Sequence, residues 1–150
     1  MWTFFCISVV AVLLLVLWLQ ELKRDGALRA MVIRRRFTYI GQVLPRSLTL
    51  HGTPLERASS VWNVFEGDCG GIRVIAFDYS IGYGKGGRRR TAIAAQSPRD
   101  VFGAAKFISD LTVARSGDWA IMYEQETISL VNPGLMPVPE IEAHLDSIGS

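Results

Sequence analysis

Charged side chains are missing from the first twenty residues of this 150-residue sequence. As an α-helix, the 18 residues from Trp2 to Leu19 would extend about 27 Å, close to the thickness of the hydrocarbon layer of a bilayer. We therefore expect residues 1–20 to form a transmembrane anchor.

The usual signs of a cleaved signal peptide are also missing. No Lys or Arg precedes the apolar run, and its end, from Leu17 to Gln20, lacks the small residues of a cleavage site. A buried core helix is the other alternative, and the length and N-terminal position of the run disfavour it. A retained anchor is the preferred interpretation.

Basic residues follow the anchor and none comes before it. Lys23, Arg24, Arg29 and the triplet at 34–36 all lie within about twenty residues of the apolar run. The positive-inside rule then predicts a single-pass protein of the inner membrane, with its N-terminus outside and its C-terminal domain in the cytoplasm.

Cysteine and histidine are scarce. Cys6 lies in the apolar run and Cys69 in the soluble part, so we expect no disulfide between them. His51 and His144 lie in no recognisable catalytic or zinc-binding pattern. We predict no catalytic residue, no metal site and no cofactor, and favour a protein that is not an enzyme; an enzyme with an unrecognised site stays open.

A nucleotide-binding P-loop is absent as well. The glycine-rich segment 82–87, followed by three arginines, lacks the order G-x-x-x-x-G-K-[ST] and joins two predicted strands. It is either a hairpin tip with solvated arginines, which we prefer, or a site for an anionic lipid or a phosphate.

The charge is unevenly distributed. Residues 21–100 carry 14 Lys or Arg against 7 Asp or Glu, and residues 101–150 carry 2 against 7. Anionic lipid near the anchor accounts for the first basic triplet, so nucleic acid is an unlikely partner. The residues proposed to contact an anion or lipid are Lys85, Arg88, Arg89, Arg90, Arg34, Arg35 and Arg36.

What is present predicts an α+β fold, with a mainly antiparallel sheet and a C-terminal helix beginning near Pro139. A basic juxtamembrane helix is expected at 21–36, with Asp25-Gly26 as a break that caps the helix following it, ahead of a cytoplasmic domain at 37–150. The predicted strands are 37–40, 61–65, 72–81, 88–95, 111–114, 119–123 and 127–131.

Strands 72–81 and 88–95 are predicted to pair symmetrically about the glycine-rich loop. Asp78 would then face Thr91 and lie diagonally next to Arg89, which we expect to be its ion-pair partner. The alternative is a carboxylate that acts as an acid or base. On strand 72–81, the predicted core face consists of Ile75, Phe77, Tyr79 and Ile81.

Three stretches, residues 61–95, 116–125 and 137–145, resemble a recurring type of uncharacterised bacterial domain that is anchored by a single membrane pass. The likeness covers about two-thirds of the chain and lies in strand and turn patterning. It implies a bacterial inner membrane and no particular activity.

These observations predict a membrane-tethered interaction or scaffold module. Its expected partners are the lipid bilayer and another membrane or cytoplasmic protein.

Overall fold

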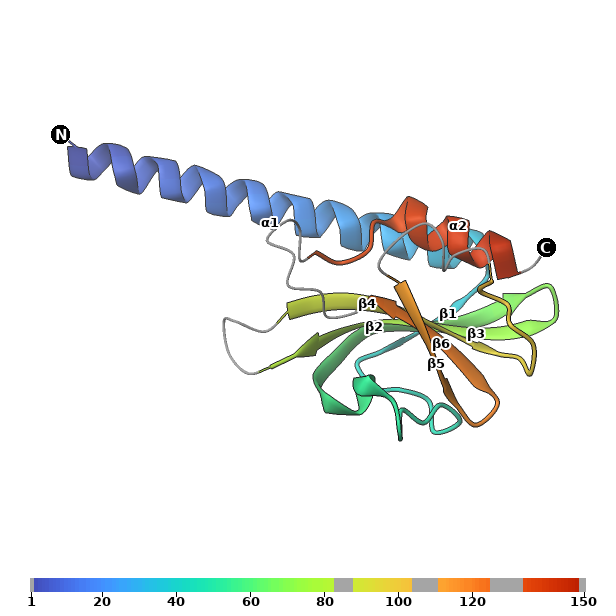
Figure 1. Ribbon diagram of the computed structural model, residues 1–150. Coiled ribbons are helices and arrows are strands. Elements are labelled where there is room, and N and C mark those ends of the chain that lie inside the picture. Colours follow the sequence, from blue (N-terminus) through green and yellow to red (C-terminus); the bar gives the residue numbers. More distant parts are fainter. Residues whose placement is uncertain (1, 83–87, 104–110, 125–133, 149–150) are drawn as a thin grey trace.

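The computed structural model describes residues 2–82, 88–103, 111–124 and 134–148. It confirms the α+β fold: a long N-terminal helix and a short C-terminal helix lie on one face of a six-stranded sheet (Figure 1). The elements are α1 (Trp2–Arg34), β1 (Thr38–Gly41), the 3-10 helix η1 (Pro54–Arg57), β2 (Ala58–Cys69), β3 (Ile72–Ile81), β4 (Arg88–Gln96), β5 (Leu111–Ser116), β6 (Trp119–Glu124) and α2 (Val138–Ile148).

Every pair of neighbouring strands is antiparallel, in the order β1-β2-β3-β4-β6-β5. The predicted register of the β3–β4 hairpin is confirmed, since Asp78 pairs with Thr91 and Ile81 with Arg88. β2 is longer than predicted and has a bulge between Trp62 and Phe65. The predicted strand at 127–131 lies outside the described residues.

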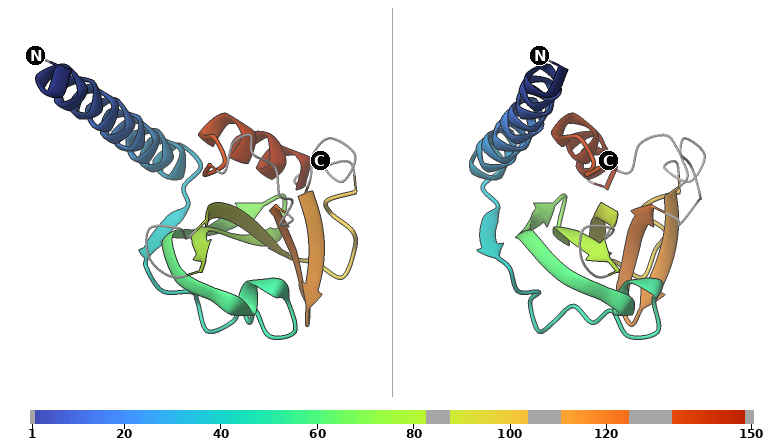
Figure 2. Two further views of the ribbon diagram at one scale, coloured as in Figure 1. Left: turned by 60° about the vertical axis from the view of Figure 1, so that its left-hand side comes forward. Right: turned by 90° about the vertical axis from the view of Figure 1, so that its left-hand side faces the viewer.

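The prediction that the sheet has one core face is incomplete. Ile75, Phe77 and Tyr79 are buried as expected, but the alternate residues Val74 and Ala76 are equally buried. The first set packs under the β1–β2 connection, to which Leu48 and Leu55 contribute, and the second set packs under the helices. The sheet is therefore covered on both faces, and β3 is its buried centre (Figure 2).

Helix α1 continues through Asp25 and Gly26, so the break expected there is wrong. An interior glycine costs a helix about 1 kcal/mol relative to alanine. Burial of Leu28, Met31 and Val32 against the sheet offsets that cost. The anchor and the juxtamembrane segment are thus one helix of 33 residues.

The two halves of α1 have different surroundings. From Cys6 onward the apolar half is exposed, with Leu14 at 62% of its maximum, and it projects beyond the domain (Figures 1 and 2). Within the described chain, α1 is the one helix long and apolar enough to cross a membrane. The second half, after Glu21, lies along the sheet beside α2.

The end of α1 is fixed by an aromatic contact. Phe37 follows the helix and packs on Phe65 of β2, with 6.1 Å between ring centroids. Its ring also occupies the space above Gly67, where a β-carbon would overlap it. The glycine therefore allows the chain to pass closely over β2 before it enters β1.

Candidate functional site: the junction of α1 with the sheet

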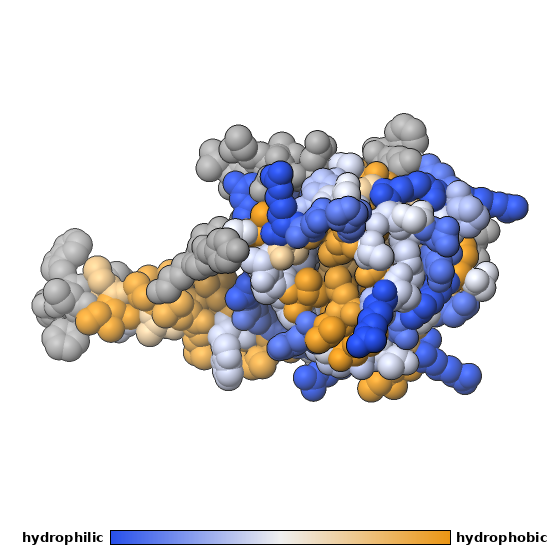
Figure 3. Space-filling model, turned by 90° about the horizontal axis from the view of Figure 1, so that it is seen from below, coloured by the Kyte–Doolittle hydropathy of each residue, from blue (hydrophilic) through white to orange (hydrophobic). Residues whose placement is uncertain are grey.

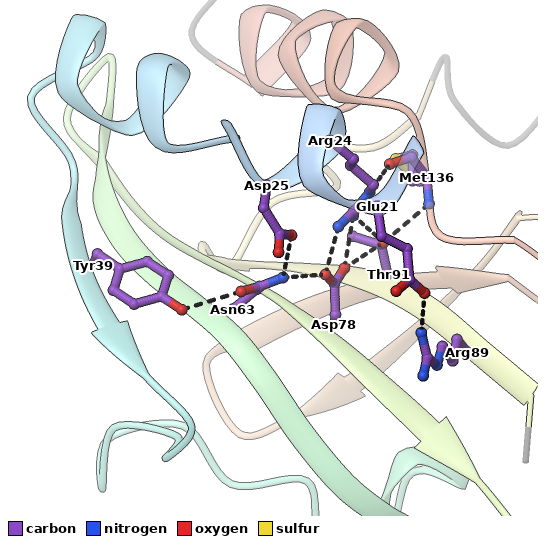
Figure 4. Close-up of polar contacts among 9 residues, drawn as sticks. All are labelled: Glu21, Arg24, Asp25, Tyr39, Asn63, Asp78, Arg89, Thr91 and Met136. Carbon is purple, nitrogen blue, oxygen red and sulfur yellow. Dashed lines mark hydrogen bonds and ion pairs between the residues drawn. The ribbon is translucent and has the colours of Figure 1, made fainter. Parts of the chain in front are cut away.

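A buried ion pair joins α1 to the centre of the sheet. Arg24 donates from Nη1 to Asp78 Oδ2 at 2.8 Å and from Nη2 to Asp78 Oδ1 at 2.9 Å (Figure 4). The Asp78 side chain is 3% exposed and that of Arg24 is 14% exposed. This two-pronged geometry is the strongest form of an arginine–carboxylate contact and fixes orientation as well as distance.

Two further groups hold the carboxylate of Asp78. Thr91, its cross-strand neighbour, donates from Oγ1 to Oδ1 at 2.7 Å, and Asn63 donates from Nδ2 to Oδ2 at 3.0 Å. Asn63 lies at the bulge of β2 with φ of 50°, a left-handed conformation that asparagine tolerates. Tyr39 of β1 in turn donates its hydroxyl to Asn63 Oδ1 at 3.1 Å.

The segment that leads into α2 joins the same network. Arg24 Nε donates to the carbonyl of Met136 at 3.2 Å, and the Met136 amide donates to Thr91 Oγ1 at 3.0 Å. One arginine of α1 thus connects the helix, the middle strands and the start of α2. We call Arg24, Asn63, Asp78 and Thr91 the junction network.

The junction network explains why Asp78 lies in an apolar strand. Both of its oxygens accept two hydrogen bonds each, which compensates for the loss of water on burial. Leaving one member of such a pair without its partner costs about 3–5 kcal/mol. Asp78 is therefore a structural link between α1 and the sheet.

The predicted partner of Asp78 is wrong. Arg89 instead forms an ion pair with Glu21 of α1 and stacks over Trp62, with 5.9 Å from its guanidinium carbon to the ring centroid. Arg89 pairs with Ser80, two residues further along the hairpin and on the same face of the sheet as Asp78, where Glu21 of α1 binds it instead. It adds an exposed contact between α1 and the hairpin, beyond the buried one.

The first basic triplet contacts α2. Arg34 pairs with Glu142, and Arg35 pairs with both Glu142 and Asp146, the latter at 2.7 Å. Arg36 is exposed and has φ of 56° at the turn into β1. Two of the three proposed lipid contacts are thus engaged in holding α2 against α1.

The three arginines of the second basic triplet, at the start of β4, differ in their exposure and in their partners. Arg90 is buried and pairs with Glu124 at 3.2 Å, whereas Arg89 is exposed. Arg88 is half-buried and forms no ion pair with any residue that the structure describes. Lys85 lies outside the described residues.

The cysteine and the histidines do not form a common site. Cys69 is buried between the sheet and the helices, and burial raises the pKa of its thiol. His51 contacts Glu56 in the β1–β2 connection. His144 is partly buried on α2, and burial lowers the pKa of its ring. Within the described ranges, no three His, Cys, Asp or Glu residues lie close enough to bind a metal ion.

An open hollow of about 700 Å³ lies between η1, the end of β3 and the end of β6. Ile81 and Tyr123 form apolar parts of its wall, and Arg57 and Glu124 contribute charge. Figure 3 shows apolar surface along the middle of the face opposite the helices, bordered by hydrophilic residues. Neither Asp78 nor Tyr79 lines this hollow.

The chain matches no protein-family model, no curated protein and no solved structure in the comparisons made. The resemblance to a bacterial membrane-anchored domain gains no support from them. The fold and the junction network are consequently the basis for a functional argument.

Proposed function

We propose that this chain is a single-pass protein of a bacterial inner membrane that holds its C-terminal domain in a fixed orientation at the cytoplasmic face, where the domain binds a protein partner. The observation that carries the proposal is the Arg24–Asp78 ion pair, five residues beyond the apolar run. It joins the membrane segment to the domain directly.

The exposure of the apolar half of α1 supports the membrane assignment. Large side chains such as Val12 and Leu14 are exposed by 59% and 62% of their maximum. A stretch of such residues is stable in lipid and unfavourable in water. A core helix of a soluble protein would instead bury them, whereas the most apolar window of α1 is 0% buried.

The absence of a linker supports a fixed orientation. Anchored domains on flexible tethers explore many orientations because their linkers are mobile chains. Here α1 passes from the apolar run into the domain without interruption, and Arg24 and Leu28 are both packed against other elements. The direction of the helix in the bilayer then determines which surface of the domain faces away from it.

An exposed apolar side chain at the far end of α1 marks a candidate protein-binding surface. Ile33, the last but one residue of α1, is 77% exposed. Ile33 lies fourteen residues past Leu19, or about 21 Å along the helix. That distance exceeds the reach of a side chain, so lipid does not account for the exposure of Ile33.

Site-specific crosslinking in cells tests the proposal. A photoreactive residue in place of Ile33 is expected to trap one discrete partner protein, and the same residue in place of Asp118, which lies in the β5–β6 turn, is expected to trap none. Equal, diffuse labelling from both positions would contradict the proposed protein partner. A reporter fused after Ser150 that is active only outside the cytoplasm would contradict the orientation.

A further inference from the structure

We propose that one end of the domain rests on anionic headgroups of the bilayer that α1 spans. This hairpin end consists of the last residues of β3, the first residues of β4 and the start of β2. The proposal rests on the membrane-spanning role of α1 given above, and adds to it a lipid-contacting surface on the domain itself.

The contacts between α1 and the hairpin establish how far the hairpin reaches. Asp78 lies level with Arg24, and Arg89 lies level with Glu21, so β3 advances toward the N-terminus of α1 (Figure 4). Arg24 is about 7.5 Å beyond Leu19 along the helix. β3 continues three residues past Asp78, which adds about 10 Å.

β3 thus runs back about 10 Å from the level of Arg24, and Arg24 lies about 7.5 Å past Leu19. Ile81 and its partner Arg88 are therefore level with the last residues of the apolar run. Figure 1 shows the ends of β3 and β4 running alongside α1 in that direction. If Leu19 marks the edge of the hydrocarbon layer, the hairpin end lies in the headgroup layer.

The charge of the hairpin end suits an anionic surface. The carboxylates of neighbouring elements have partners: Glu21 of α1 pairs with Arg89 and Glu124 of β6 with Arg90, while Glu56 of η1 accepts a hydrogen bond from the Gly52 amide and contacts His51. By contrast, Lys23, Arg57 and Arg88 form no ion pair with described residues. Lysines and arginines close to an anionic bilayer are attracted to it.

An aromatic side chain adds to the match. Trp62 is half-buried beneath the Arg89 guanidinium, which pairs with Glu21, and Trp18 lies three residues before Glu21 on α1 and is 57% exposed. Indole rings favour the headgroup layer because they combine an apolar body with a polar N–H. The opposite end of the domain, at the β2–β3 and β5–β6 turns, carries the exposed acids Asp68 and Asp118 instead.

The test uses the full-length protein in lipid vesicles, with Cys6 and Cys69 replaced by alanine and one fluorophore attached through a new cysteine. Ser59→Cys labels the hairpin end, and Asp118→Cys is the matched control at the far end; both residues are exposed. The vesicles contain phosphatidylcholine with or without phosphatidylglycerol, and a lipid carrying a nitroxide on its headgroup quenches the fluorophore.

We expect quenching at position 59 to exceed quenching at position 118 several-fold. The combined change Lys23→Glu, Arg57→Glu and Arg88→Glu should reduce quenching at position 59 in phosphatidylglycerol vesicles and change it little in phosphatidylcholine alone. Equal quenching at both positions in protein that floats with the vesicles would overturn this proposal and leave the anchor intact. Full-length protein that does not float with the vesicles would overturn both this proposal and the membrane-spanning role of α1.

Discussion

The two halves of α1 belong to one helix and follow different physical rules. In the first half every turn is apolar and exposed, and no described residue of the domain packs on the stretch from Cys6 to Leu19. The second half mixes charged and apolar residues, buries Leu28 and Met31, and places Arg24 on a carboxylate in the sheet. The difference teaches that one helix can combine a segment long and apolar enough to cross a membrane with a segment held by specific contacts.

The largest effect is expected in the second half, from Asp78→Ala. This change leaves the Arg24 guanidinium in a mostly buried position without its carboxylate, and should lower the free energy of unfolding of the domain by about 3–5 kcal/mol. Chemical denaturation in detergent micelles measures it. Asp118→Ala, at an exposed turn, is the control and should change stability by less than about 0.5 kcal/mol. Equal stability of the two variants would contradict the conclusion that the junction network holds α1 on the sheet.

The next effect is expected in the first half, from Leu13→Arg. An arginine near the centre of the apolar run opposes membrane insertion by about 2.5–3.5 kcal/mol, so the protein should shift from the membrane pellet to the alkaline-soluble fraction. Leu13→Phe, which stays apolar, is the control. Because Leu13 is 57% exposed and far from the sheet, the domain should unfold at the same denaturant concentration in all three proteins. A change in that midpoint would mean that the apolar half of α1 contributes to the stability of the domain, so that the two halves are not independent.

A smaller effect is expected where the second half ends, from Gly67→Ala. The added methyl group displaces the Phe37 ring and should destabilise the domain by about 1–3 kcal/mol. Gly26→Ala, on the open side of α1 with no neighbour within 4 Å, should instead stabilise it by about 0.5–1 kcal/mol. Thermal unfolding of both variants compares the two glycines. Destabilisation by Gly26→Ala would show that the uninterrupted path of α1 is incorrect.

The smallest effect concerns the contact of α2 with α1 and is a pH dependence. Burial lowers the pKa of His144 in the folded protein, so as the pH falls through about 6.5 the unfolded chain takes up a proton before the folded one does. Stability should therefore decrease as the solution is acidified. His144→Gln should show a weaker decrease between about pH 7.5 and about pH 5.5. The same slope in both proteins would exclude a contribution from His144.

The sequence predicts the local features of the fold and fails where distant segments meet. The bounds of β3, the pairing of Asp78 with Thr91 and the apolar helix follow from alternation, turn residues and hydropathy, which are local signals. The partner of Asp78 does not follow, since Arg24 is 54 residues away and several other arginines are as plausible. The only sequence signal was a carboxylate in an apolar strand. Such a carboxylate needs a cationic partner when it is buried, but the sequence does not indicate which lysine or arginine supplies it.

The second covered face of the sheet and the uninterrupted α1 were missed for a related reason. Leu48 and Leu55 lie in an irregular segment without periodicity, so nothing local indicates that it packs under β3. Asp25-Gly26 is a typical helix break in isolation, and burial of Leu28 and Met31 outweighs that preference. Of the residues proposed to contact lipid, the sequence could not show that Arg34, Arg35, Arg89 and Arg90 have carboxylate partners.

The most direct test of the fixed junction is a distance measurement by pulsed electron paramagnetic resonance. Spin labels at Leu22→Cys on α1 and Asp118→Cys at the far turn, in full-length protein with Cys6 and Cys69 replaced by alanine and embedded in lipid nanodiscs, report the orientation of the helix relative to the sheet. A single narrow distance distribution that broadens on Asp78→Asn is the expected result. A broad distribution in the otherwise unchanged protein, or one that Asp78→Asn leaves as narrow as before, would contradict the account.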